Sequence, residues 1–275
     1  MTIKRIGIVG YGHLGKYLTD AVLERPDFDL AFVWNRSISA LEGNIEGRFI
    51  CRELEDIGQF SPDLIVEVAH PVISEKYGPH FLQVADYLVG SPTALASQNV
   101  ENSLREAATN HGLYIPAGAF WGGEDILKMA DRGTLKALKV TMKKHPSCFK
   151  LEGSLKAQNE SIEGTDPSVL YEGPVRDLCP LAPNNVNTMA AAAMAAHNLG
   201  FDGVTGCLIS DPKLTDWHIV EVDVTGPEVG GKNFNVKTVR HNPAAPGAVT
   251  GTATYASFLS SMVRAGGRGA GVHLC

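Results

Sequence analysis

The sequence has 275 residues, of which 44% are hydrophobic and 20% charged, enough apolar material for one or two packed domains. A formal net charge of −6, with no basic run longer than the pair Lys143-Lys144, argues against a nucleic-acid-binding protein. No apolar segment reaches about 18 residues, and the start of the sequence lacks a signal-peptide pattern, so we expect a cytoplasmic protein without a membrane partner.

The five cysteines are widely spaced and form no CxxC pair. An odd number without such pairs fits reduced thiols better than disulfides or a zinc site. The sequence therefore predicts no bound metal.

Over the first 118 residues, short apolar runs alternate with amphipathic stretches, as βαβ units require. The runs lie at 6–9, 30–34, 49–51, 64–68, 87–89 and 113–115. This pattern predicts a Rossmann-type, doubly wound parallel sheet covered by helices on both faces, in an α/β protein.

Gly10, Gly12 and Gly15 form a GxGxxG motif between the first strand and the first helix. In that context the first glycine permits a tight turn, the second lets a pyrophosphate approach the backbone, and the third brings helix and strand together. We expect a dinucleotide at this turn, also contacted by His13 and Leu14 at the start of the helix.

The second strand ends in Asn35-Arg36, where an acidic residue would bind the ribose 2′-hydroxyl of NAD. Asn35 can still hydrogen-bond the ribose, and Arg36 can pair with a 2′-phosphate. The cofactor is therefore expected to be NAD or NADP, with preference left open because Arg36 can also be a solvated loop cation.

Ala69 and His70 follow the fourth strand and are expected to line the cofactor site, since ligands of such sheets bind at the carboxyl ends of the strands. His70 is a candidate base. A loop histidine beside Pro71 is more often a packing or hydrogen-bonding residue.

From residue 119 the strand-like runs become longer, at 135–143, 218–225 and 234–239, with an alanine-rich helix at 188–196. We expect a second, α+β domain with an open mixed sheet at 119–246, responsible for substrate binding, catalysis and homodimerisation. Residues 1–118 form the Rossmann domain in this prediction, completed by the C-terminal helix 247–275.

His218 shares one face of its strand with Val220, Val222 and Val224. An imidazole on this apolar wall fits a satisfied core histidine as well as a catalytic one. Spacing alone leaves both interpretations open.

Four segments carry a resemblance to the L-aspartate dehydrogenase family: the opening GIVGYGHLG, 116-PAGAFWGGEDI-126, 183-PNNVNTMAAA-192 and 211-DPKLTDWHIVEV-222. The resemblance implies reversible oxidative deamination of L-aspartate to iminoaspartate, hydrolysed to oxaloacetate and ammonia, with NAD or NADP as oxidant. It implies cofactor contacts for Ala119 and Asn187 and a catalytic role for His218. One group with a pKa near 7 can serve both proton transfers of such a reaction, and histidine fits that need.

A dicarboxylic substrate needs two anion-binding groups. The helix opened by 119–125 offers free backbone amides, so Phe120, Trp121 and Gly122 are candidate substrate residues. Of the paired lysines at most one faces the cleft, and Lys144 is the candidate. Asn185 is a further candidate that can instead cap the alanine-rich helix.

Departures from the family pattern leave the substrate less certain than the reaction type. The strand reads Asp216-Trp217-His218 where Asn-x-His is usual, and Phe120-Trp121 replaces small residues. The alternatives are a related NAD(P)-dependent oxidoreductase with another substrate, such as a homoserine dehydrogenase or dihydrodipicolinate reductase relative, and a non-catalytic NADP-binding sensor.

Overall fold

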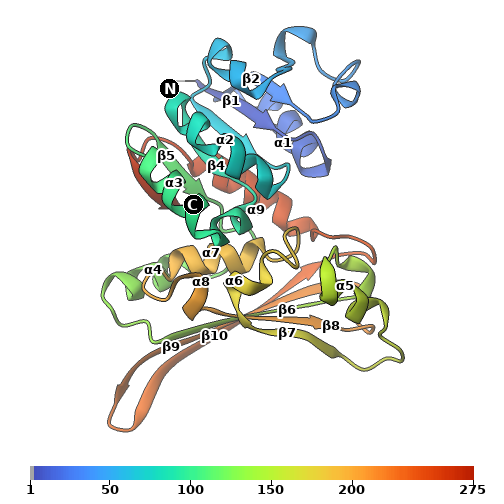
Figure 1. The fold of residues 1–275 in the computed structure, drawn as a ribbon, viewed down its shortest axis with the longest axis vertical. Coiled ribbons are helices and arrows are strands. Elements are labelled where there is room, and N and C mark those ends of the chain that lie inside the picture. Colours follow the sequence, from blue (N-terminus) through green and yellow to red (C-terminus); the bar gives the residue numbers. More distant parts are fainter. Residues whose placement is uncertain (1–2) are drawn as a thin grey trace. The chain divides into compact units, whose positions relative to one another are not determined.

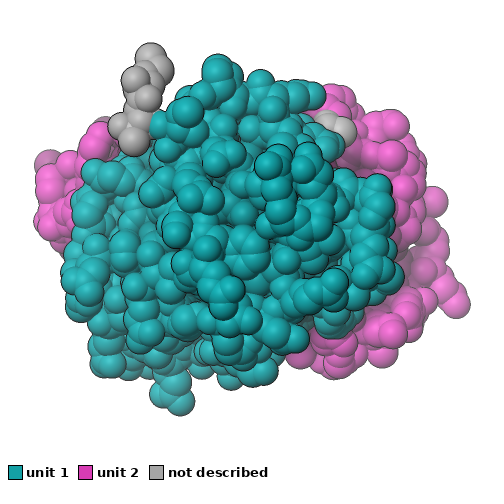
Figure 2. Space-filling view, turned by 90° about the horizontal axis from the view of Figure 1, so that it is seen from above, with its two compact units in different colours: residues 1–116, 258–273, 275 teal, residues 117–257, 274 magenta. Residues whose placement is uncertain are grey.

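The computed structural model describes residues 3–275, without the side chain of residue 252. The chain divides into two compact units, coloured separately in Figure 2. Unit 1 comprises residues 1–116, 258–273 and 275, and unit 2 comprises residues 117–257 and 274.

Unit 1 is built on a six-stranded sheet of order β11-β5-β4-β3-β1-β2. Neighbours among β1 to β5 pair in parallel, as predicted. The strands are β1 (Lys4–Val9), β2 (Phe28–Trp34), β3 (Leu64–Glu67), β4 (Asp86–Val89), β5 (Gly112–Ile115) and β11 (Gly271–Leu274). The helices are α1 (His13–Glu24), α2 (Pro71–Val84), α3 (Gln98–Ala107) and α9 (Thr252–Arg264), with 3₁₀ turns at Ile38–Ala40, Gly47–Phe49, Leu54–Phe60 and Pro92–Ala96.

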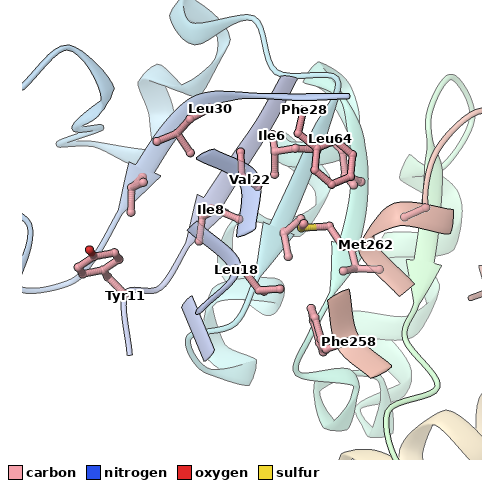
Figure 3. Packing of buried hydrophobic residues seen from close by; sticks show 14 of the residues in the cluster. Ile6, Ile8, Tyr11, Leu18, Val22, Phe28, Leu30, Leu64, Phe258 and Met262 are labelled. Carbon is pink, nitrogen blue, oxygen red and sulfur yellow. The ribbon is translucent and has the colours of Figure 1, made fainter. Parts of the chain in front are cut away.

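Helices cover both faces of this sheet. On one face, Leu18 of α1 and Met262 of α9 belong to a fully buried cluster with the strand residues Ile6 and Ile8 (Figure 3). On the other, Phe81 of α2 packs edge-on against Tyr87 of β4, with ring centroids 5.2 Å apart. This arrangement confirms the doubly wound fold.

One predicted strand of unit 1 is wrong, and the C-terminal helix is shorter than predicted. Residues 49–51 form no strand: a 3₁₀ turn runs through Phe49, and Ile50 makes only an isolated bridge to Val33. The predicted C-terminal helix stops at Arg264 because the following segment contains four glycines with φ between +76° and +104°. Residues 271–274 then form β11, so the sixth strand comes from the end of the sequence.

Unit 2 holds a five-stranded sheet of order β10-β9-β6-β8-β7. The strands are β6 (Ala137–Lys144), β7 (Ser168–Pro174), β8 (Thr205–Ser210), β9 (Trp217–Val229) and β10 (Lys232–Pro243). Because β6 and β8 pair in parallel and the other pairs are antiparallel, the sheet is mixed, as predicted. The sequence pattern missed β7 and β8.

Helices lie along one face of this second sheet in Figure 1. They are α4 (Gly123–Asp131), α6 (Val175–Leu178), α7 (Asn187–Ala195) and α8 (Gly200–Gly203); α5 (Gly153–Glu160) and a 3₁₀ turn at Pro146–Cys148 complete the unit. Every residue of α7 after Asn187 is buried, which explains its alanines: small side chains let a central helix be packed on all sides.

The two faces of this sheet differ in chemistry. Val220, Val222 and Val224 of β9 are buried on the helix-covered face. On the other face Glu221 pairs with Lys143 and Lys237, which lowers the pKa of the Glu221 carboxyl. In the described part of the chain, no helix is long and apolar enough to cross a membrane.

Candidate active site

The glycine turn of unit 1 uses each glycine differently. Gly10 has φ +111°, and a Cβ there would lie 2.9 Å from the backbone of Val68 and Ala69. A Cβ at Gly15 would lie 2.0 Å from the carbonyl oxygen of Gly10, so this glycine is required for α1 to pack on β1. A Cβ at Gly12 would meet nothing within 4 Å. The space beside Gly12 is therefore open to a ligand at the start of α1.

A groove of about 480 Å³ lies beside this turn. Six predicted cofactor residues line it: Gly10, Gly12, Asn35, Arg36, Ala69 and His70. His13, Leu14 and Gly15 are not among the lining residues: His13 is exposed at the start of α1, and Gly15 is buried beneath it. No acidic residue occupies the first turn of α1, which suits a phosphate at that helix end.

Asn35 connects the end of β2 to the glycine turn. Its Oδ1 accepts a hydrogen bond from the Tyr11 backbone N–H (3.1 Å), and its Nδ2 donates to the Ser37 carbonyl (3.0 Å). The neighbouring Arg36 is exposed and forms no ion pair with any described residue. Arg36 is thus free to receive an anion in the groove.

Glu67 is a buried carboxylate that the sequence analysis missed. It accepts hydrogen bonds from the backbone N–H groups of Ala69 (2.6 Å), His70 (2.8 Å) and Ser91 (3.0 Å) and from the Ser91 hydroxyl (3.1 Å). Burial raises its pKa to about 7, against the lowering effect of these hydrogen bonds. Glu67 therefore holds two groove residues in place.

His70 caps α2. Its Nδ1 accepts a hydrogen bond from the backbone N–H of Val72 (3.3 Å), a structural role that the sequence had left open. The ring also lines the groove.

Unit 2 contains a small polar cavity of about 90 Å³ on the helix-covered face of its sheet. Five predicted site residues line it: Ala119, Lys144, Asn185, Asn187 and His218. The predicted catalytic histidine and three predicted polar ligands thus come together, although they are far apart in the sequence.

Three neighbouring strands supply the floor of this cavity. In the register, Asn242 of β10 lies opposite His218, and Met142 of β6 lies opposite Val220. Because side chains alternate between faces, Lys144 shares its face with Met142 and His218 shares its face with Val220. The imidazole therefore projects from the middle strand, between side chains of β6 and β10.

His218 is only 4% exposed, and its Nε2 has no hydrogen-bond partner among the described residues. Burial, and then the nearby positive charge of Lys144, lower its pKa to about 4. A backbone hydrogen bond to Ala248 acts in the opposite direction. The buried Nε2 is therefore open to a hydrogen bond with a ligand.

Lys144 is 3% exposed, and burial lowers its pKa to about 8. Its Nζ donates a hydrogen bond to the Val249 carbonyl (3.0 Å), and no described carboxylate pairs with it. Lys143, on the other face, pairs with Glu221 instead. The prediction that one lysine at most faces the cavity is confirmed.

The two asparagines before α7 differ in their bonding. Asn185 accepts from the Lys150 N–H (2.8 Å) and donates to the Cys148 carbonyl (3.2 Å), which fastens a neighbouring loop. It does not cap α7, whose N-cap is Val186, which excludes the alternative of a capping role. The buried Oδ1 of Asn187 has no partner in the described chain and remains available to a ligand.

Phe120, Trp121 and Gly122 do not line this cavity. Phe120 is buried, Trp121 is 66% exposed, and both line a separate groove of about 590 Å³ in unit 2. Gly122 is the N-cap of α4 with φ +82°, and Glu124 and Asp125 occupy the first turn of that helix. Those carboxylates make this helix end a poorer anion site than Lys144.

Among the described residues, no group of histidine, cysteine, aspartate or glutamate side chains is arranged to hold a metal ion. All five cysteines are free, and four of them are buried.

Residues 125–261 match the family model for the C-terminal domain of aspartate dehydrogenase, and residues 10–116 match the NAD-binding domain of homoserine dehydrogenase. An aspartate dehydrogenase domain-containing protein of Xenopus tropicalis is 57% identical over 278 residues, covering 98% of each chain. An L-aspartate dehydrogenase of Methanopyrus kandleri is 31% identical over 175 residues, which cover 62% of this chain and 61% of that protein.

Among solved structures, aspartate dehydrogenase from Thermotoga maritima superposes with a TM-score of 0.68 at 19% identity, covering 95% of this chain and 94% of that one. The two chains therefore share a fold.

Proposed function

The chain belongs to the aspartate dehydrogenase family of NAD(P)-dependent amino-acid dehydrogenases, and we propose that it oxidises L-aspartate to iminoaspartate, which water converts to oxaloacetate and ammonia. The observation that carries this proposal is that one small cavity holds both a neutral histidine and a buried lysine. Among the described residues, the histidine Nε2 has no hydrogen-bond partner and the lysine has no carboxylate partner. These two groups meet the needs of an amino acid: a base for its amine and a cation for its carboxylate.

The base role follows from the state of His218. The amine of the substrate must be neutral before its Cα can be oxidised, so a proton must leave it. In the tautomer that carries its own proton on Nδ1, the neutral imidazole can accept the amine proton at Nε2. Once that proton has been released to solvent, the neutral imidazole can remove a proton from the water that adds to the imine.

Substrate binding strengthens this base. The positive charge of Lys144 disfavours protonation of His218 in the free protein. A carboxylate bound at Lys144 cancels much of that charge, so the proton affinity of the imidazole rises when substrate is present. Deprotonation of the amine is thereby coupled to recognition of the carboxylate.

The cofactor, NAD or NADP, supplies the oxidant by accepting two electrons and the Cα hydrogen. The groove of unit 1 fits its phosphates, because Gly12 leaves open space beside the start of α1 and Arg36 is a cation there that pairs with no described carboxylate. In unit 2, Ala119 and the free Oδ1 of Asn187 are the proposed contacts to its carboxamide end.

The decisive experiment incubates the purified protein with a panel of amino acids and either NAD or NADP, and follows absorbance of the reduced nicotinamide. L-aspartate is expected to give the highest kcat/KM. A higher kcat/KM with another amino acid would show that L-aspartate is not the preferred substrate, while the proposed type of reaction would stand. Cofactor binding without turnover of any amino or hydroxy acid would favour a nucleotide sensor instead.

A further inference from the structure

Arg240 of β10 is a half-buried cation for which the described part of the chain provides no counter-charge. Its Nη1 donates a hydrogen bond to the Gly118 carbonyl (3.1 Å), and it pairs with no described carboxylate. Burial lowers its pKa, as expected for a charge removed from water without compensation. A guanidinium that is partly removed from water and has no described carboxylate partner is available to an anionic ligand.

The position of Arg240 relates it directly to His218. Arg240 lies opposite Val220, and Asn242, two residues further along β10, lies opposite His218. Arg240 therefore shares the face of the sheet that carries the imidazole. His218 stands on the middle strand of three, with Lys144 on β6 to one side and Arg240 on β10 to the other.

The distances implied by this register suit a short ligand. Neighbouring strands are about 4.8 Å apart, and two residues along a strand span about 6.7 Å. Lys144 is thus on the strand beside His218, whereas Arg240 is displaced from His218 both across and along the sheet. An arginine side chain is long enough to cover that displacement.

One loop borders both cations. Ala119 lines the His218 cavity, whereas its neighbours Gly118 and Phe120 line the groove that contains Arg240. Ser257 also donates to the Gly118 carbonyl (2.7 Å), which fixes the loop from a second side. Only one of the five guanidinium N–H groups is used by Gly118, so the others remain available for a bidentate contact.

We propose that Arg240 binds the side-chain carboxylate of a dicarboxylic amino acid whose α-carboxylate is held by Lys144. This assignment rests on the proposed amino-acid oxidation. The α-carboxylate is attached to the carbon that bears the amine, so it belongs with the cation nearer to His218. The second carboxylate lies one carbon further away and belongs with the more distant cation.

Arg240 then determines which substrate is accepted. An amide in place of the carboxylate would leave the guanidinium without a charge partner, as it is in the free protein. A site that relies on a buried charged contact discriminates strongly against a ligand lacking it. The structure thus assigns the choice of aspartate over asparagine to this residue.

The first test compares Arg240→Gln with Lys232→Gln, which removes an exposed cation of the same strand. The ratio of kcat/KM for L-aspartate to that for L-asparagine is expected to fall about tenfold or more in Arg240→Gln, through KM for aspartate. The ratio should be unchanged in Lys232→Gln and partly restored in Arg240→Lys. Equal losses for both substrates, or an unchanged ratio, would overturn the assignment.

The second test does not depend on turnover. Calorimetry measures binding of succinate, which has both carboxylates but no amine, and of butyrate, which has one carboxylate. Wild type should bind succinate at least about tenfold more tightly than butyrate, and Arg240→Gln should lose this difference. If wild type shows it but oxidises no amino acid, the proposed function fails and the anion site stands. Equal binding of the two acids by wild type refutes the site.

Discussion

The candidate ligand sites of the two units are formed in opposite ways. The groove of unit 1 is shaped by absent side chains: Gly12 leaves room, and Gly10 and Gly15 allow a close turn. The cavity of unit 2 is shaped by buried polar side chains, with unpartnered atoms on His218 and Asn187.

This difference shows that the polar groups proposed for catalysis in unit 2 are expected to lower stability, whereas the glycine turn of unit 1 is not. Backbone amides at a helix end bind phosphate without burying any charge. Proton transfer and carboxylate recognition require ionisable groups out of water, and such burial destabilises the fold. Substitutions in unit 1 should therefore separate binding from folding cleanly, whereas in unit 2 loss of function should be accompanied by gain of stability.

The largest effect is expected for His218→Ala. Turnover should fall by about 10²-fold or more, because the proposed acceptor of the amine proton is removed. Affinity for the cofactor, measured by calorimetry, should be nearly unchanged. A variant with near-normal kcat would remove His218 from the mechanism.

Lys144→Met should affect function and stability in opposite directions. Loss of the cation should raise KM for L-aspartate by about tenfold or more. The folded protein should gain up to about 3 kcal/mol in denaturant unfolding at pH 7, since a buried lysine with a pKa of about 8 destabilises the fold by that order.

The pH dependence follows from the same pKa. Folding lowers the pKa of Lys144 from 10.5, so its destabilising effect is complete below pH 8 and disappears as pH rises from 8 to 10.5. Succinate binding to wild type should therefore weaken above pH 8 as the charge is lost. Lys143→Met, on the other face of the strand, is the matched control and should preserve both KM and this pH dependence.

Gly12→Ala and Gly15→Ala separate binding from folding in unit 1. Alanine at position 12 meets no neighbour, so stability should be nearly unchanged while cofactor affinity falls by about tenfold. Alanine at position 15 collides with the Gly10 carbonyl and should lower the free energy of unfolding by about 3 kcal/mol. Thermal unfolding and cofactor titration of both variants distinguish the two roles.

Arg36→Ala should have the smallest effect. The substitution is expected to weaken the binding of NADP by about 1–2 kcal/mol and the binding of NAD by less, because only NADP carries a 2′-phosphate. Equal losses for the two cofactors, measured by titration with each, would refute a phosphate contact.

Local patterns predicted the parts of the fold that depend on near neighbours. The GxGxxG turn and the apolar runs of β1 to β5 are each readable within a few residues. The strand at residues 271–274 was not predicted, because it pairs with β5, more than 150 residues away in the sequence. Four residues are also too few to show a clear strand pattern. The apolar run at 49–51 was misassigned because short 3₁₀ turns and strands bury similar residues.

The site was predicted only in part for a related reason. Family motifs made His218, Asn187 and Ala119 candidates, and strand alternation added Lys144; all four line the same cavity. Arg240 and Glu67 lie outside those motifs, and nothing local shows that they lack a counter-charge. Alternation along β10 could have placed Arg240 on the face of Asn242, but pairing it with His218 requires the register of β9 and β10.

Unit 1 is formed from two segments that are separated in the sequence by unit 2, and this affects how the protein folds during synthesis. Its apolar cluster requires Phe258 and Met262, and β11 covers the edge of β5, yet all of these emerge from the ribosome after the whole of residues 117–257. A nascent chain therefore passes through a stage at which unit 2 has all its strands, while the first 116 residues expose an open sheet edge and an uncovered apolar face. Open strand edges and exposed apolar faces promote aggregation. Residues 3–116 therefore remain prone to aggregation until residues 258–274 have been synthesised and have packed against them.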